Sequence, residues 1–526
     1  MRQVRINQGN NGPELQFPHT FNVASALIDR HLDEGRGKKT AILTVDETVN
    51  YETLVTNVNR YGNALKKIGL LAGDRVLMVI KDAPEFYYVF WGCIKTGIIP
   101  VPLNTMLTSE DYKFIIADSG ANVLVYSEEF KDQITAAIMA ETPLQHVLPA
   151  RHVAGSLAEL ARDESPTLAA SPAAADDDCF WLYSSGTTGR PKGVVHAHRD
   201  IVATSQLYNV GILGGNVSDI YYSIPRLFFA YGLGCGMTFP LWVGGTAVLD
   251  ARRPLPPITA ELFARFKPTI FAAVPTYFSA LLASSLLKSE HVVTLRRCVS
   301  GGEALPEELQ RRWRQIAPAP ITDGIGSTEA LHIYISNTID DIRPNSSGRA
   351  VPGYQLRIID ENGDAILDDS PGRLLVKGPS VTRRYWNNPA KTASSIVDGW
   401  LDTGDTYYRD SDGYYYYCGR NDDMLKVGGI WVSPFEIEAA LISHPDVLEA
   451  AVTGRADDAG LIKPEAWIVL KIAAYAGELL AEDIRTLCKT ALAPYKYPRW
   501  IHFVDELPKT ATGKIQRFKL RNAAHD

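Results

Sequence analysis

Apolar, β-branched runs alternate with helical patterns through the first part of the chain, and this alternation constrains the fold more than any other feature. Residues 41–45 and 75–80 have the composition of buried strands, whereas residues 23–32, 51–65 and 84–93 have that of helices. Strands that are apolar on both faces and are separated by helices are typical of parallel sheets covered on both sides. The sequence therefore predicts an α/β fold with mostly parallel sheets.

The pattern changes at three places, which suggest domain boundaries. Alanine, proline, serine and aspartate dominate residues 165–178, which indicates a surface connector. After about residue 353 short strand-like runs with a turn signal at residues 361–363 predict β-hairpins. Beyond residue 423 a compact α/β segment reaches the C-terminus. A chain of 526 residues has room for about three or four domains or subdomains.

The longest apolar run, residues 270–287, contains Pro275, Thr276 and Tyr277 and several serines. We interpret it as a buried strand, a turn at Pro275 and a packed helix. The alternative is a membrane span, which proline and the hydroxyl groups disfavour.

Charge and cysteine content narrow the function classes. The net charge is −7, so a broad basic surface for nucleic acid is not expected. The six cysteines form no CxxC pair and no Cys/His cluster with zinc spacing. The first residues lack the apolar segment of a signal peptide. We therefore expect a cytoplasmic protein with reduced thiols, without a membrane or nucleic-acid partner.

Residues 184–193, SSGTTGRPKG, follow a strand-like run and crowd glycines, hydroxyls and cations into ten positions. Glycines let backbone N–H groups approach an anion, and hydroxyls add donors, so this stretch suits a phosphate. Its spacing differs from a Walker A loop, because Gly186 and Gly189 are three apart and Lys192 precedes Gly193. A tight surface turn with solvated polar groups is the alternative for such a stretch taken alone.

The longer stretch YSSGTTGRPKG resembles the phosphate-binding signature of the adenylate-forming superfamily, which includes acyl- and aryl-CoA synthetases, adenylation domains of peptide synthetases and firefly-type luciferases. Further stretches resemble the other motifs of that superfamily in the expected order: SGGEALP at 300–306, GIGSTE at 324–329, WLDTGD at 400–405, GRNDDMLKVGG at 419–429 and LPKTATGKIQR at 507–517. The resemblance covers essentially the whole chain.

The resemblance implies a set of nucleotide-site residues. Thr328 would contact the α-phosphate, Glu329 would help to hold Mg²⁺, and Lys514 would be the catalytic lysine. The ATP- and AMP-binding residues would be Ser184, Ser185, Gly186, Thr187, Thr188, Lys192, Gly301, Gly302, Glu303, Asp323, Gly324, Asp405 and Arg420. A pantetheine tunnel for coenzyme A would be lined by Gly428, Gly429 and Trp431.

The resemblance also implies the domain organisation. An N-terminal domain of residues 1–421 would contain two stacked α/β subdomains and a small β-barrel-like subdomain at about residues 350–421. A small mobile α+β domain of residues 422–526 would carry Lys514 and rotate about Asp422 between two half-reactions. A homodimer is expected only because the resemblance implies it.

Two stretches, RLFFAYGLG at 226–234 and GSTEALHIYISN at 326–337, resemble the acyl pocket of benzoate-CoA-ligase-like members. That likeness places six residues around an aromatic ring: Ala230, Tyr231, Ala273, Gly326, His332 and Ile333. One departure is the pair Ala272–Ala273, where the benzoate enzymes typically have Tyr-Gly, and it leaves room beside the ring.

The implied activity is that of an aryl-CoA ligase that uses ATP, Mg²⁺ and coenzyme A. A benzoate or small substituted benzoate, such as 2-aminobenzoate or a hydroxybenzoate, would become an acyl-adenylate with release of pyrophosphate. A thiol would then displace AMP. The alternatives are an adenylation enzyme that loads a carrier-protein thiol, a luciferase-like oxygenase and a non-catalytic nucleotide sensor. The sensor is disfavoured because Thr328, Glu329, Asp405 and Lys514 are all present.

Overall fold

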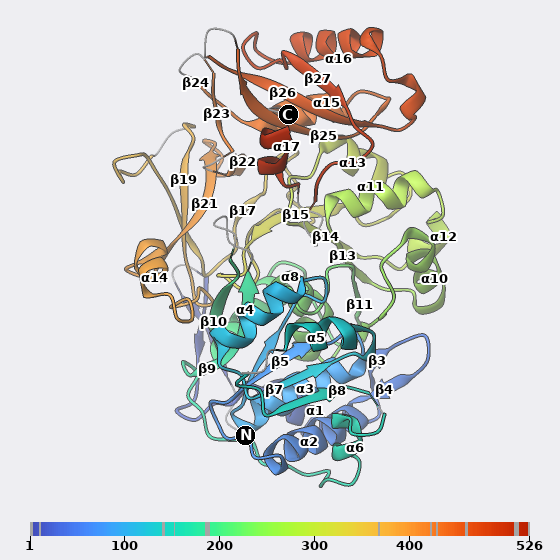
Figure 1. The fold of residues 1–526 in the computed structure, drawn as a ribbon, viewed down its shortest axis with the longest axis vertical. Coiled ribbons are helices and arrows are strands. Elements are labelled where there is room, and N and C mark those ends of the chain that lie inside the picture. The colour runs from blue at the N-terminus through green and yellow to red at the C-terminus, as the bar shows by residue number, and fades with distance from the viewer. Residues whose placement is uncertain are drawn as a thin grey trace.

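The computed structural model describes residues 4–9, 12–138, 142–151, 153–184, 190–366, 369–420, 423–427, 430–457, 461–509 and 515–523 (Figure 1). It confirms the α/β fold, with parallel strands dominating its two main sheets.

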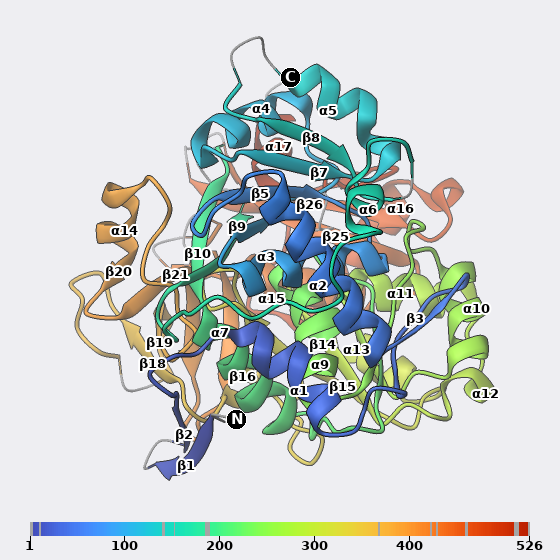
Figure 2. The ribbon, with the colours of Figure 1, turned by 90° about the horizontal axis from the view of Figure 1, so that it is seen from below.

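The first sheet has four strands, all parallel, in the order β6 (Ile99–Pro102), β5 (Arg75–Val79), β7 (Val123–Tyr126) and β8 (His146–Pro149). Helices α2 (Tyr51–Lys67) and α3 (Pro84–Thr96) pack on one face, and α4 (Ser109–Ser119), α5 (Lys131–Ala137) and the hairpin of β9 (Asp178–Ser184) and β10 (Lys192–Ala197) pack on the other. Figure 2 shows α2 and α3 beneath this sheet.

The second sheet has nine strands, of which the central six are parallel. Its order is β17 (Arg349–Ala350), β16 (Ile333–Ser336), β15 (Ile321–Gly326), β14 (Arg297–Gly301), β13 (Ile270–Ala273), β11 (Ile220–Ser223), β12 (Thr246–Val248), β3 (Thr40–Leu43) and β4 (Thr48–Asn50). One face is covered by α10 (Pro256–Phe266), α11 (Pro275–Ser284), α12 (Ser289–Val292) and α13 (Glu307–Trp313).

The other face of the nine-stranded sheet is covered by a chain of short helices. They are α7 (His198–Thr204), η3 (Ser205–Val210), α8 (Ala230–Leu233), η4 (Gly234–Thr238) and α9 (Phe239–Val243). One hydrophobic core unites Val76 and Val123 of the first sheet with Ile42 and Ala247 of the second, through the helices between them. The two α/β units are therefore stacked on shared helices.

Local signals explain the two longest helices of this region. The Asn50 side chain accepts a hydrogen bond from Thr53 N at 2.8 Å and caps α2, which contributes about 1 kcal/mol. Pro84 occupies the first turn of α3, where its missing N–H costs nothing, and α3 ends at Gly97 in the left-handed region, with φ +79°.

The helix expected at residues 23–32 is present but divided. A π-helical turn, η1 (Ser25–Asp29), leads into α1 (Arg30–Asp33), because apolar spacing alone does not distinguish i+4 from i+5 hydrogen bonding. The remaining short elements of this part are β1 (Arg5–Gly9), β2 (Gly12–Gln16), η2 (Glu128–Phe130) and α6 (Leu157–Ala161).

The interpretation of residues 270–287 is confirmed, because β13 ends at Ala273, Pro275 begins α11, and both elements are packed in the core. In the described part of the chain, no helix combines the length and the apolar character needed to cross a membrane.

A five-stranded antiparallel sheet forms the β-rich part. It comprises β18 (Gln355–Ile359), β19 (Gly372–Lys377), β21 (Trp400–Arg409), β20 (Ile396–Val397) and β22 (Tyr415–Arg420), with α14 (Pro389–Ser395) beside it. The expected turn is present, with Gly363 at φ +91°, but the main partner of β18 is β19. Of the described residues after the turn, Ala365 forms an isolated bridge with Ile359 and Ile366 N donates to the carbonyl of Ile358, whereas β19 supplies five register pairs.

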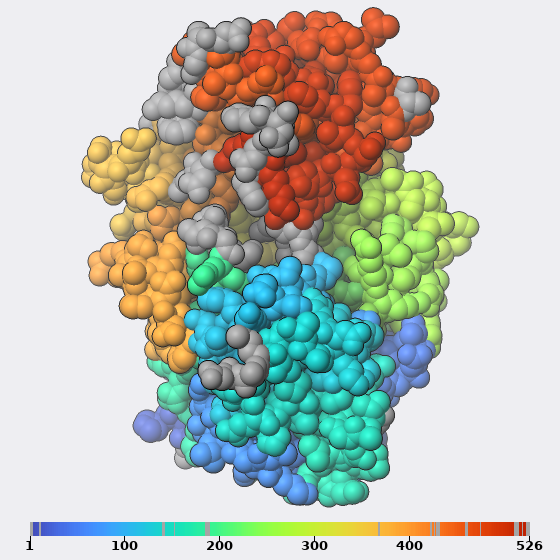
Figure 3. All heavy atoms as spheres, in the orientation of Figure 1, coloured from blue at the N-terminus to red at the C-terminus, as the bar shows by residue number. Residues whose placement is uncertain are grey.

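The C-terminal part lies at one end of the molecule, in orange to red (Figures 1 and 3). Its sheet contains β25 (Val447–Ala456), β26 (Ile462–Leu470) and β27 (Trp500–Phe503). Helices α15 (Pro434–Ile442) and α16 (Glu478–Ala491) pack on one face of this sheet, and α17 (Arg517–Ala523) packs on the other. The hairpin β23 (Leu425–Val427) and β24 (Ile430–Val432) and the short η5 (Ala473–Tyr475) complete it. The rings of Tyr417 in β22 and Phe435 in α15 lie 4.7 Å apart.

Candidate functional site

The predicted acyl and adenine residues meet at the carboxyl ends of three neighbouring parallel strands. Ala273 ends β13, Gly301 ends β14 and Gly326 ends β15. Gly301 lies opposite Gly324 in the register of β14 and β15. In open α/β sheets, ligands bind in the crevice outside the carboxyl ends of the strands. The candidate site is therefore at this edge.

Tyr231 of α8 anchors the acyl side of the site. Its hydroxyl donates to the carbonyl oxygens of Val299 at 2.9 Å and Ala273 at 3.2 Å, at the ends of β14 and β13. A methyl group on Gly301 would lie 3.8 Å from Tyr231 Cε1 and 3.7 Å from Ile333 Cδ1. The structure thus brings Tyr231, Ile333 and Gly301 together, while buried Ala230 precedes Tyr231 in α8.

His332 is buried on the same side, with 2% of its surface exposed. Its ring lies 5.7 Å from that of Tyr231 and 4.5 Å from that of Phe239. Burial lowers the pKa of His332 to about 3, so the imidazole is neutral. Nε2 lies 3.7 Å from Cys235 Sγ, and Nδ1 has no hydrogen-bond partner among the described residues. A buried ring nitrogen without a partner is a candidate ligand contact.

Two glycines allow the close approach of His332. A Cβ atom on Gly234 would overlap the imidazole, and one on Gly326 would overlap the carbonyl of His332. Cys235 is one of six scattered cysteines, so nothing in the sequence singles it out. Its contact with His332 is visible only in the fold.

Asp323 lies in β15 opposite Ser300 of β14, and 8% of its surface is exposed. Burial raises the pKa of Asp323 to about 8, against a smaller lowering by the Ser300 hydroxyl and the Gly324 amide. The carboxyl is therefore mostly protonated at neutral pH and offers both a donor and an acceptor. Its Oδ1 has no hydrogen-bond partner among the described residues, so this buried carboxyl is also a candidate ligand contact.

The predicted adenine-side stretch continues from β14. Gly302 is exposed with φ +89°, and Glu303 accepts a hydrogen bond at Oε2 from Thr276 N at 3.3 Å. Thr276 belongs to the first turn of α11, so this stretch is attached to the helix that follows β13.

Thr328 and Glu329 follow β15 in a turn held by residues outside the motif. The carbonyl of Thr328 accepts from His196 Nε2 at 2.9 Å, and the carbonyl of Glu329 accepts from Thr382 N at 2.7 Å. The Glu329 carboxylate accepts a hydrogen bond from the Tyr385 hydroxyl at 3.0 Å. Sequence reasoning did not identify His196, Thr382 or Tyr385 as site residues, because they lie more than fifty residues from the turn and in no recognised nucleotide motif.

Asp405 and Arg420 form an ion pair across the ladder of β21 and β22. They are register partners, and Arg420 Nη1 lies 2.9 Å from Asp405 Oδ1. Burial lowers the pKa of Arg420, but Asp405, Tyr417 and Glu329 together outweigh this effect and leave that pKa raised. Gly404, at φ +71°, provides the space, since a side chain there would meet the guanidinium.

The two strands that flank the phosphate motif, β9 and β10, end near Glu329 and Arg420. Ser184 at the end of β9 lies opposite Lys192 at the start of β10. Burial and then the charge of Lys391 lower the pKa of Lys192, while Glu329 opposes this effect. Lys192 thus lies within electrostatic reach of Glu329. The structure brings together the predicted residues Thr328, Glu329, Lys192, Asp405 and Arg420 from four segments of the chain.

Several predicted residues lie outside the described part of the chain: Ser185, Gly186, Thr187 and Thr188 of the phosphate motif, Asp422, Gly428, Gly429 and Lys514. Trp431 is described only through its backbone in β24.

The donor set of the site fits the implied Mg²⁺. Among the described residues no group of three or more His, Cys, Asp or Glu side chains could hold a metal by itself. Glu329 offers one carboxylate, and Mg²⁺ is usually bound through one or two carboxylates together with substrate phosphates and water. Hard oxygen ligands of this kind suit the ion.

A separate cavity of about 360 Å³ lies near Asp178, at the amino end of β9, and none of the predicted site residues lines it. The stacked rings of Trp181 and Trp386 form part of its wall.

Two protein-family models match the chain. The model of the AMP-binding enzyme family matches residues 29–386, and that of the AMP-binding enzyme C-terminal domain matches residues 436–514. A benzoate–CoA ligase of Thauera aromatica is 49% identical over 521 residues, 98% of this chain and 99% of that protein.

Two solved structures are similar over nearly the full length. The anthranilate CoA ligase AuaEII in complex with anthranoyl-AMP has a TM-score of 0.91 and 42% identity, covering 97% of this chain and 98% of that one. A benzoate CoA ligase from Burkholderia xenovorans LB400 has a TM-score of 0.90 and 41% identity, covering 95% of this chain and 100% of that one. With a family model matching more than half of its length, the chain belongs to the AMP-binding enzyme family.

Proposed function

We propose that this chain is an AMP-forming aryl-CoA ligase whose substrates are a small aromatic carboxylic acid, ATP and coenzyme A. The observation that carries the proposal is that a ring-lined group of residues at the carboxyl edge of the nine-stranded sheet lies near a polar group that includes a pair from the five-stranded sheet. Tyr231 and His332 form an apolar, ring-lined side, and Thr328, Glu329 and the Asp405–Arg420 pair form a polar side. The similarity to a benzoate–CoA ligase over 98% of the chain supports it.

The acid is benzoate or a small substituted benzoate, with 2-aminobenzoate as a candidate. The Tyr231 hydroxyl donates to backbone carbonyls, so it has no proton left for a ring substituent. Nδ1 of neutral His332 has no hydrogen-bond partner among the described residues, so we assign it as the atom that binds a polar ring substituent. The small Ala272 and Ala273 leave room beside the ring, and an anthranilate CoA ligase is among the similar structures.

The nucleotide is held by the residues that resemble family motifs. Gly301, Gly302, Glu303, Asp323 and Gly324 surround adenine, and Asp405 and Arg420 bind the ribose. Thr328 contacts the α-phosphate. Ser184, Ser185, Gly186, Thr187, Thr188 and Lys192 hold the β- and γ-phosphates. The position of Gly301 opposite Gly324 and the Asp405–Arg420 pair support this assignment.

The reaction has two steps. The aryl carboxylate attacks the α-phosphorus, forming an aryl-adenylate and breaking the bond to pyrophosphate; the CoA thiol then attacks the acyl carbon and AMP leaves. Both steps need charge neutralisation and alignment more than acid–base catalysis. Lys514 bridges the carboxylate and the α-phosphate as a point charge. Glu329 would help to hold Mg²⁺, which would neutralise phosphate charge.

Domain rotation separates the two steps. We place the boundary between residues 1–421 and 422–526, with Asp422 as the hinge. In the second step Gly428, Gly429 and Trp431 line the path of the pantetheine arm. The two family models match on either side of this boundary, which supports it. The location is cytoplasmic, an assignment supported by six free and buried cysteines.

The decisive experiment mixes enzyme, ATP, Mg²⁺, coenzyme A and benzoate or 2-aminobenzoate, and identifies every product. AMP, pyrophosphate and an aryl-CoA thioester are expected. ADP instead of AMP would overturn the mechanism, and nucleotide binding without turnover would favour a sensor.

A panel of acids compared by kcat/KM tests the acyl assignment. Small aryl acids are expected to exceed medium-chain fatty acids, and the reverse order would refute the aryl pocket. Supplying a carrier protein in place of coenzyme A separates the ligase from an enzyme that loads a carrier thiol, which would turn over only the carrier.

A further inference from the structure

We propose that His196 is a positioning residue that fixes the α-phosphate turn at Thr328 relative to the strand that follows the phosphate motif. The inference rests on the proposed function. Among the described strands β10 pairs in a ladder with β9, and outside it forms an isolated bridge between Val194 and Tyr385. Thr328 follows β15 of the nine-stranded sheet. No ladder of described strands joins β10 directly to β15, so the direct contact between β10 and the Thr328 turn is made by a side chain.

The first contact is the hydrogen bond between His196 Nε2 and the carbonyl oxygen of Thr328, at 2.9 Å. The same oxygen accepts a bond from Leu331 N at 3.0 Å, and Leu331 has the unusual φ of +65°. A carbonyl oxygen can only accept, so Nε2 carries a proton. His196 thus holds the turn from outside while Leu331 N closes it from within.

The second contact fixes the imidazole itself. His196 Nδ1 lies 3.0 Å from Asp200 Oδ2, which also accepts from Ala197 N at 3.0 Å. Both side chains are buried, with 0% and 4% of their surface exposed. Whether the shared proton sits on nitrogen or on oxygen, Nε2 keeps its own proton, so the pair always presents a donor to Thr328.

The ring plane is also set by packing. The Phe180 ring in β9 stacks on His196 with centroids 5.2 Å apart and planes at 22°. A parallel link reinforces the connection one residue along: Thr382 donates through Oγ1 to the carbonyl of Val195 at 2.6 Å and through its backbone N to the carbonyl of Glu329 at 2.7 Å. Two adjacent positions of β10 are thereby connected to two adjacent positions of the turn.

In this arrangement the side chain at position 196 must form hydrogen bonds with both Asp200 and the Thr328 carbonyl. A shift of about 1 Å in a group that aligns reactants costs on the order of 100-fold in rate. The amide nitrogen of asparagine reaches the position of Nδ1 and can satisfy Asp200, but it does not reach Thr328. The amide nitrogen of glutamine reaches the position of Nε2 and can donate to Thr328. Both substitutions remove the ring.

The test compares His196→Asn with His196→Gln in acid-dependent ATP–pyrophosphate exchange and in thermal unfolding. We expect His196→Asn to lower kcat by about 100-fold with the KM for the acid nearly unchanged, and His196→Gln to recover most of that loss at a similar Tm. His198→Asn is the matched control: His198 is a neighbouring buried histidine that accepts a hydrogen bond from Val23 N at 3.2 Å, so its replacement should lower Tm and leave kcat within a few-fold of wild type.

Equal losses in the two amide variants, or wild-type kcat in His196→Asn, would overturn the proposal. Should neither amide variant fold, His196→Phe retains the stack on Phe180 without any N–H group. It is expected to lose as much kcat as His196→Asn, and wild-type exchange by this variant would refute the role. Failure of the proposed function is distinguishable, because wild-type enzyme would then show no exchange with any aryl acid.

Discussion

Polar side chains buried at the carboxyl edge of the nine-stranded sheet have atoms that the described protein does not satisfy. Asp323 Oδ1, His332 Nδ1 and the Tyr334 hydroxyl belong to this group. Buried polar groups are normally hydrogen-bonded, and leaving one unpaired costs about 1–3 kcal/mol. At the residue scale this edge is therefore built to be completed by a ligand.

Asp323 gives the first prediction. The folded-state pKa of about 8 lies above the ordinary value of 3.8, so the folded state favours the protonated carboxyl. Its contribution to stability is complete below about pH 4 and is lost as the pH rises toward 8. Asp323→Asn keeps a neutral donor and acceptor at every pH. We expect the stability of Asp323→Asn relative to wild type to rise between pH 5 and pH 8.

Urea unfolding of both proteins without ligand, at pH 5 and at pH 8, measures this difference. Titrations elsewhere are common to the two proteins and cancel. Parallel pH profiles would show that Asp323 is ionised in the folded protein across this range.

His332 gives the second prediction. His332→Phe keeps an aromatic ring but removes both nitrogens, whereas His332→Asn places an amide near the position of Nδ1. One hydrogen bond contributes about 0.5–1.5 kcal/mol. We expect His332→Phe to reduce the kcat/KM ratio of 2-aminobenzoate to benzoate by about tenfold, and His332→Asn to retain part of it.

Cys235→Ala is the control, because it removes the sulfur contact of Nε2 and leaves Nδ1 untouched. An unchanged kcat/KM ratio of the two acids in His332→Phe would mean that the imidazole does not bind the ring substituent.

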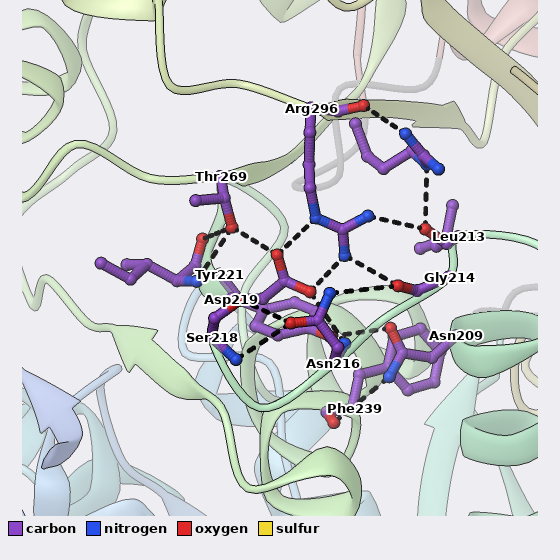
Figure 4. A network of polar contacts seen from close by, with 12 residues as sticks. Asn209, Leu213, Gly214, Asn216, Ser218, Asp219, Tyr221, Phe239, Thr269 and Arg296 are labelled. Carbon is purple, nitrogen blue, oxygen red and sulfur yellow. Dashed lines mark hydrogen bonds and ion pairs between the residues drawn. The ribbon is translucent and has the colours of Figure 1, made fainter. Parts of the chain in front are cut away.

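At the scale of elements, the opposite edge of the sheet is held by a partly buried ion pair between Asp219 and Arg296. Asp219, at the amino end of β11, accepts bonds from Thr269 Oγ1 at 2.7 Å and Asn216 N at 2.8 Å and pairs with Arg296 (Figure 4). Arg296 also donates to the carbonyls of Leu213 and Gly214. Figure 4 shows Thr269, Asn216 and Arg296 around the Asp219 carboxylate. The network fastens the starts of β11, β13 and β14, while their other ends form the site.

This separation gives the third prediction. Arg296→Met leaves Asp219, whose side chain is 1% exposed, as a buried charge without its cation, and breaking such a pair costs about 3 kcal/mol. The first unfolding transition should fall in temperature, with kcat nearly unchanged below it because the network is at the far edge. Adding Asp219→Asn should restore part of the stability. A large loss of kcat at unchanged Tm would contradict this division of the sheet.

At the scale of the whole molecule, the two parts of the chain meet beside the candidate ribose site. The Tyr417 ring packs on Phe435, and the Arg517 guanidinium lies 4.3 Å from the centre of the same Phe435 ring. Arg517 is itself bound to Glu438 at 2.8 Å. Side-chain contacts of this kind are compatible with the rotation that we propose, because relative motion of domains is the default unless their interface is large and hydrophobic.

Rotation gives the fourth prediction. Lys514→Ala should lower adenylation by about 1,000-fold, the size of effect seen for a single group that stabilises transition-state charge. It should largely spare thioester formation from supplied aryl-AMP, since Lys514 would have left the site in that step. Lys509→Ala is a matched control from the same segment, where Lys509 pairs with Glu449 at 2.7 Å. Equal loss of both half-reactions in Lys514→Ala would argue against rotation.

The sequence by itself determined the alternation of strands and helices and the family to which the chain belongs. Periodicity and the order of motifs are local properties, so β5, α2, α3 and the break at Pro275 were predictable. Strand pairing was less predictable. The turn at Gly363 was expected, but β18 pairs along its whole length with β19, which lies beyond that turn.

Only the tertiary structure decided which side chains meet. Asp405 and Arg420 are fifteen residues apart, yet their ion pair required the register of β21 and β22. His196 and Thr328 are 132 residues apart, and Tyr385 and Glu329 are 56 apart. No motif records such contacts, because they depend on how separate sheets pack. The sequence identifies the chemistry of the site, and packing supplies the side chains that hold it in place.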